Sequence, residues 1–175
     1  MGTNSFDNIS IRGRVAFVIM CFEKYVSVKY PERDWSRVSE MMWRICDSSD
    51  YIDNSANKYM EIIPEYLFET DNFAEAEFDY LSEEDFSYFV SIIPNDDHIL
   101  NTIMHAVYSI AMEYAYVAIE KDAPDTREYI EDTLKALSDE NITAPDIQLV
   151  SKYTFDESDG WGHSFDGRYL SVILK

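Results

Sequence analysis

The chain has 175 residues, of which 46% are hydrophobic and 15% aromatic, and its formal net charge is −20. Such a composition is too apolar for intrinsic disorder, and the length suits one domain with a continuous core. The acidic balance disfavours direct binding to nucleic acids or to anionic membranes, because both require a patch of lysine and arginine.

The negative charge is concentrated in the middle of the chain. Residues 1–58 contain 8 acidic and 8 basic residues, whereas residues 59–120 contain 14 carboxylates and neither lysine nor arginine. The same middle segment is rich in phenylalanine and tyrosine. An acidic segment that also carries large apolar groups can fold, and its field would attract basic proteins.

Apolar residues at helical spacing predict two helices in the first 48 residues. Asn8 or Ser10 is expected to cap the first helix, which ends before Pro31. Asp34 is expected to cap the second, which the polar cluster at 47–50 ends.

The next stretch contains a third helix and an irregular connection. Asn54 or Ser55 is expected to cap this helix, and Pro64 indicates a kink or a restart before residues 65–69. Residues 70–80 form the most acidic connection, and we expect it to be partly irregular.

Two further helix starts carry carboxylates. Ser82 can cap a helix whose first turn holds three acidic residues, where the helix dipole favours them, and Asp96 and Asp97 begin the next helix by the same logic. Residues 99–119 are apolar on nearly all sides. They are long enough to cross a bilayer, but interrupting polar residues favour a buried central helix of a bundle.

The last part of the chain changes character after one more helix, which is capped by Asp125 or Thr126 and ends near Asn141. Residues 147–150 and 169–174 fit either strands or short helices. Between them lies a glycine-bearing loop around Trp161, which either closes the end of the core or serves as an exposed anchor at an interface.

These patterns predict a mainly all-α fold, a single-domain helical bundle around a central apolar helix. The helical body covers residues 9–140, and a small irregular or β-containing segment covers residues 146–175. No secretory signal opens the sequence, so we expect a soluble, cytoplasmic protein.

Chemical motifs are not evident. The loop that starts at Asp53 has Lys58 where a calcium-binding EF-hand needs glycine, and His98 and His105 lack a nearby ligand at metal spacing. Cys21 and Cys46 are expected to be reduced, buried thiols. No nucleophile elbow or phosphate-binding glycine loop is present, so we predict no enzymatic activity, no metal and no cofactor.

In its size, its acidic block at 65–97 and its lack of catalytic motifs, the chain resembles the immunity proteins of bacterial toxin systems, including contact-dependent growth inhibition. Two tryptophan-bearing segments, 35–43 and 159–162, add to the resemblance. It implies a tight complex with one toxin domain, often a nuclease, whose active site is blocked or distorted.

The residue chemistry supports the same hypothesis, because clustered carboxylates steer a basic partner while aromatic side chains slow its release. We predict that the partner binds at Glu65, Glu69, Asp71, Phe73, Glu75, Glu77, Asp79, Glu83, Glu84, Asp85, Asp96, Asp97 and Trp161. Within this set, we find no structural reason for the absence of lysine and arginine from residues 65–79.

Three alternatives stay open at this point. The protein could be a DNA mimic or adaptor that occupies the basic groove of a nucleic-acid-binding protein. It could be a hydrolase that uses a pair of carboxylates, although an acidic chain offers many such pairs. The net charge could also serve solubility alone.

Overall fold

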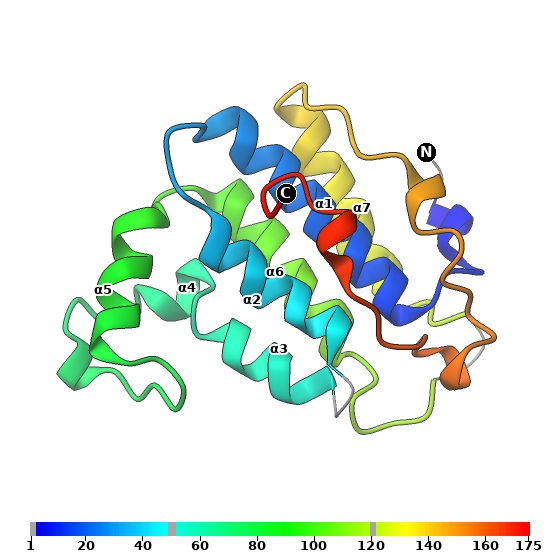
Figure 1. Ribbon diagram of the computed structural model, residues 1–175, viewed down its shortest axis with the longest axis horizontal. Coiled ribbons are helices and arrows are strands. Elements are labelled where there is room, and N and C mark those ends of the chain that lie inside the picture. Colours follow the sequence, from blue (N-terminus) through cyan, green and yellow to red (C-terminus); the bar gives the residue numbers. More distant parts are fainter. Residues whose placement is uncertain (1–2, 49–51, 120–121) are drawn as a thin grey trace.

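The computed structural model describes residues 3–48, 52–119 and 122–175, and Figure 1 shows how its helices are arranged. The α-helices are α1 (Ile11–Lys29), α2 (Ser36–Asp47), α3 (Ile52–Met60), α4 (Pro64–Leu67), α5 (Glu83–Ile92), α6 (His98–Met112) and α7 (Thr126–Asp139). Short 3-10 helices lie at η1 (Thr3–Phe6), η2 (Phe73–Glu75), η3 (Ile147–Leu149), η4 (Ser158–Gly160) and η5 (Gly167–Tyr169). The predicted all-α class is confirmed.

The C-terminal segment is irregular rather than β-structured. The first apolar stretch contains the short 3-10 helix η3, the second begins at the last residue of η5, and the described residues form no strand. One isolated antiparallel bridge joins Ile9 to Thr154, so the segment meets the start of α1 without building a sheet.

The most buried helix is α1, because fifteen of its nineteen residues are buried. It packs against α2, α6 and α7, and α6 in turn packs against α3 and α7 (Figure 1). The sequence pattern instead favoured residues 99–119 as the central helix. In the structure α6 ends at Met112, and Tyr116 and Val117 are 80% and 62% exposed.

The prediction of a buried helix through residue 119 is therefore wrong beyond Met112. The chain turns there toward α7, and this turn is held by the Tyr114 hydroxyl, which donates to a carboxylate oxygen of Asp125 at 2.9 Å. Within the described residues, no helix combines the length and the apolar character that crossing a bilayer requires.

Several predicted helix starts are confirmed. The Ser10 hydroxyl accepts from the Gly13 amide at 3.3 Å, so Ser10 rather than Asn8 caps α1. Ser82 and Asp85 form a capping box at α5. Asp97 accepts from two amides of the first turn of α6, and Pro64 restarts the chain as α4.

Two other predicted caps are wrong. Asn54 and Ser55 lie inside α3, which already includes Ile52. Asp34 lies one position before the cap: its carboxylate accepts from the Ser36 amide, while Trp35 occupies the cap. The cap of α7, predicted at Asp125 or Thr126, is confirmed at Asp125, although this side chain makes no cap bond because its carboxylate accepts from the Tyr114 hydroxyl.

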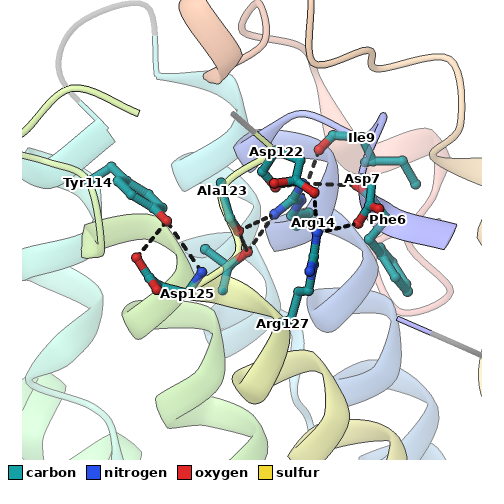
Figure 2. Close-up of polar contacts among 10 residues, drawn as sticks. Phe6, Asp7, Ile9, Arg14, Tyr114, Asp122, Ala123, Asp125 and Arg127 are labelled. Carbon is teal, nitrogen blue, oxygen red and sulfur yellow. Dashed lines mark hydrogen bonds and ion pairs between the residues drawn. The ribbon is translucent and has the colours of Figure 1, made fainter. Parts of the chain in front are cut away.

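A fully buried arginine joins the N-terminal turn to the start of α7 (Figure 2). Arg14 Nε donates to Ile9 O at 2.9 Å, and the two terminal nitrogens donate to four further oxygens, which are Phe6 O at 3.0 Å, Asp122 O at 2.6 Å, Ala123 O at 2.7 Å and Thr126 Oγ1 at 2.7 Å. Its five N–H groups thus meet five acceptors. Burial lowers the pKa of Arg14 to about 10, which still leaves it charged at neutral pH.

A fully buried carboxylate holds the C-terminal segment in place. One oxygen of Glu23 accepts from the Ser39 hydroxyl, from Trp43 Nε1 at 2.8 Å and from Ser171 Oγ at 2.6 Å, while the other accepts from the Val172 amide at 2.7 Å. These contacts join α1, α2 and the last turn of the chain at one point. Four donors compensate for the loss of water around the charge.

Both cysteines are buried thiols without a disulfide, as the sequence predicts. Burial raises the pKa of Cys21 well above its ordinary value and that of Cys46 to about 12. Such thiols are inert toward oxidants at neutral pH.

Candidate protein-binding site

Most of the acidic residues singled out in the sequence lie at one end of the molecule. They occupy the loop between α4 and α5, the first turn of α5 and the connection to α6, on the left in Figure 1. We use the name acidic surface for the exposed carboxylates of this end, which are Glu69, Asp71, Glu75, Glu77, Asp79, Glu83, Glu84 and Asp96.

The loop that bears this surface is anchored by the buried side chain of Glu61, which is only 6% exposed. Its carboxylate accepts from the amides of Asp79 at 2.6 Å, Tyr80 at 3.1 Å and Leu81 at 2.9 Å. Three amides of one turn that converge on a carboxylate form a strong, charge-assisted anchor. The exposed side chain of Asp79 is therefore carried on a fixed backbone.

Aromatic rings hold the same loop against α5. Phe73, Phe78 and Phe86 lie with ring centroids 5.7 to 6.2 Å apart, a range in which aromatic pairs attract. The phenylalanines thus point toward the helix while the intervening carboxylates face solvent. This alternation explains how so acidic a segment folds.

The carboxylates of the acidic surface are not paired with described cations. In the described part of the chain, no ion pair involves any of its eight carboxylates. Unpaired like charges on one face repel one another and raise the local negative potential. A cationic partner would relieve that repulsion on binding.

A cleft of about 420 Å³ opens within this end of the molecule. Its apolar walls include Met60, Tyr66 and Phe78, and the carboxylates around it include Glu69, Glu75, Glu77 and Asp79. A guanidinium or ammonium group is attracted both by carboxylates and by aromatic faces. The cleft therefore has the chemistry to accept an arginine or lysine side chain.

Four of the predicted binding residues already have partners inside the protein. Asp85 pairs with Arg37 and closes the capping box, and the Ser82 hydroxyl lowers its pKa. Glu65 lies 3.3 Å from His105 Nε2, and Phe73 belongs to the aromatic cluster.

Asp97 is the fourth, and it is half-buried. It accepts from the hydroxyls of Tyr25 and Tyr30, each at 2.7 Å, besides capping α6. Burial alone would raise the pKa of Asp97, but the bonds from Leu100 N, Tyr30, Tyr25 and Ile99 N lower it below its usual value. These four residues support the surface rather than extend it.

Trp161 is not brought together with the acidic residues. It is half-buried against the core, and its carbonyl accepts from the Arg12 amide at 3.0 Å, near the start of α1. In Figure 1 this loop lies at the opposite end of the long axis from α5. A site that includes both would have to span the molecule.

Sequence reasoning missed Glu61, because nothing local distinguishes its carboxylate from the exposed ones around it. The signal was weak: Glu61 directly precedes the buried apolar pair Ile62 and Ile63 in the turn after α3. Among the described side chains, no group of three or more His, Cys, Asp or Glu is arranged to hold a metal ion. Comparison with protein-family models, curated proteins and solved structures finds no match.

Proposed function

We propose that the protein binds a basic protein through its acidic surface, and that it is an immunity protein that neutralises a toxin domain of the nuclease type. The observation that carries the proposal is the set of eight exposed carboxylates without an ion pair, held on an ordered backbone. A surface evolved only for solubility does not need the loop to be anchored by Glu61 and three phenylalanines.

The negative electrostatic field of the acidic surface favours a positively charged partner. Clustered carboxylates raise the association rate of a basic partner by one to three orders of magnitude at low ionic strength. A nuclease active site must hold phosphates, and it is therefore rich in lysine and arginine. Such a cleft is complementary to this surface in sign.

The cleft bounded by Tyr66 and Phe78 supplies the short-range part of the interaction. A single arginine of the toxin that enters it would meet aromatic faces and carboxylates at once, and desolvated contacts of this kind dominate binding energy. Inhibition would follow because a side chain held here is withdrawn from phosphate binding.

The test uses the basic protein that co-purifies with this protein from its native host as the candidate toxin, with binding measured by calorimetry at 50 and 200 mM NaCl. We expect Glu77→Lys/Asp79→Lys to weaken the complex about 100-fold and to reduce its salt dependence, because reversed charges repel the partner. The control is Glu128→Lys/Asp132→Lys on α7, which makes the same change in net charge at exposed positions elsewhere.

Two results would contradict the proposal. One is equal affinity for both double variants, which would reduce the effect to net charge. The other is the absence of protection when the protein is co-expressed with the toxin domain in a sensitive strain.

A further inference from the structure

Three surface cations of this acidic protein, Arg37, Arg44 and Lys58, line one groove between α2, α3 and α5. A cavity of about 240 Å³ there is lined by Arg37, Arg44 and Lys58, together with Glu40 and Asp85. A second cavity of about 100 Å³ adjoins it and shares Met41, Arg44 and Lys58. Three cations face two carboxylates, so the groove has a local surplus of positive charge.

The three cations are not equally engaged. Arg37 is paired with Asp85, and its guanidinium carbon lies 4.2 Å from the centre of the Tyr88 ring. Arg37 is thereby fixed as part of the wall. It contributes charge to the groove rather than a free donor.

Arg44 and Lys58 retain donors that no group in the described part of the chain uses. Arg44 lies one turn after Glu40 on α2, bonds it at 3.1 Å through one terminal nitrogen, and its side chain is 68% exposed. The Lys58 ammonium lies 5.7 Å from the centre of the Tyr80 ring, and no described carboxylate lies within ion-pair distance of it. Both side chains line both cavities, so a single ligand in the groove can reach both of them.

The remaining lining is apolar. Met41 is half-buried, and Leu81 and Phe89 are buried beneath the groove, while Tyr80 is 44% exposed at its edge. Ligand sites combine an apolar lining with a few converging polar groups. Arginine and lysine together are the usual donors for phosphate and carboxylate oxygens.

We propose that this groove is a binding site for a small molecule that carries an oxyanion, a phosphate or a carboxylate, on a compact apolar body. Arg44 and Lys58 bind the oxyanion, and Tyr80, Met41 and Leu81 contact the body. Glu40 competes with the ligand for Arg44 and so sets the affinity. The site does not depend on the proposed function, because its residues are not those of the acidic surface.

The experiment is a titration of the ¹⁵N-labelled protein with pyrophosphate in one arm and citrate in the other, at 150 mM NaCl and pH 7. We expect saturable chemical-shift changes that are confined to the groove, including Arg44 Nε–H, with a dissociation constant below about 1 mM for at least one probe. The tighter probe identifies the phosphate or the carboxylate as the preferred oxyanion.

Matched variants distinguish this site from general attraction of anions. Arg44→Ala/Lys58→Ala should weaken binding at least about tenfold, the loss expected when charge-assisted hydrogen bonds are removed. Lys135→Ala, at an exposed lysine on α7, should leave it unchanged. Glu40→Gln should tighten binding about threefold or more, because Arg44 loses its internal competitor.

The proposal is overturned if neither probe gives saturable shifts up to about 10 mM. It is also overturned if Arg44→Ala/Lys58→Ala and Lys135→Ala bind the probes equally well. All the substituted side chains are exposed or half-exposed, so the variants should fold and each comparison should be interpretable.

Discussion

Replacement of Arg14 by lysine tests whether hydrogen-bond geometry, and not charge alone, holds the N-terminal turn to α7. The guanidinium serves five acceptors in three separate segments, at 2.6 to 3.0 Å. A lysine ammonium has three donors on a point-like head, so at least two of the five bonds are lost while the positive charge is kept.

The magnitude follows from those lost bonds. A hydrogen bond to a charged group contributes about 1.5–3 kcal/mol, so the loss of two predicts that Arg14→Lys destabilises the protein by about 4 kcal/mol. That is a large part of the 5–15 kcal/mol that is typical of folded domains. With a urea m-value of about 2 kcal/mol/M, the unfolding midpoint should fall by about 2 M.

The assay is urea unfolding followed by tryptophan fluorescence. Arg168→Lys is the control, because this side chain is 63% exposed and its replacement should change stability by no more than about 0.5 kcal/mol. If Arg14→Lys does not fold, Thr126→Ala removes a single acceptor of the same cluster and should cost about 1–2 kcal/mol. A midpoint for Arg14→Lys within about 0.3 M of the unmodified protein would refute the reasoning.

Two further predictions concern alkaline pH and the C-terminal segment. Burial and hydrogen bonds to Asp97 and Asp125 raise the pKa of Tyr30 and Tyr114 to about 12, above their ordinary 10. The folded state therefore holds these hydroxyl protons more tightly than the unfolded state does. The urea midpoint should be constant below about pH 10 and fall toward pH 12, because the unfolded state loses the protons first. Tyr30→Phe should make this fall shallower. Arg14 opposes this trend, since its lowered pKa favours the folded state in the same range, but it is one group against several tyrosines whose pKa is raised. Gly167→Ala should destabilise the protein by about 1–3 kcal/mol in the urea assay, because the new methyl carbon would lie 1.9 Å from the ring of Trp43. The hydrogen bond from Trp43 Nε1 to Glu23 holds this ring in place. Ser164→Ala, at an exposed position in the same segment, should be neutral, and a similarly neutral Gly167→Ala would show that this contact is not tight.

The sequence could predict what depends on neighbouring residues. The capping box at Ser82, the cap at Asp97 and the restart at Pro64 each involve groups two to four positions apart, so their signals are local. Periodicity likewise found the main helices. It could not find where α6 ends, because that depends on a bond from Tyr114 to a residue in the following connection.

The buried charges were out of reach for a related reason. Arg14, Glu23 and Glu61 look like surface residues in a helical pattern, and their partners are mainly backbone groups and hydroxyls far along the chain. Backbone acceptors and donors have no sequence signature. The sequence predicted the candidate site only as a segment rich in carboxylates. It could not show which carboxylates are exposed and which are bonded within the protein. Asp85 bonds to Arg37, and Asp97 bonds to Tyr25 and Tyr30, and these partners are known only from the structure.

The Glu23 cluster also bears on how the protein is made. Its bonds to Ser171 and Val172 connect positions 148 and 149 residues apart, so they cannot form until nearly the whole described chain has left the ribosome. Before that moment Glu23, Ser39 and Trp43 share a cluster that lacks two of its donors, and the incomplete core is a substrate for chaperones and proteases. Slow emergence of Ser171 and Val172 should therefore lower the yield of folded protein, even when all the described helices have already been synthesised.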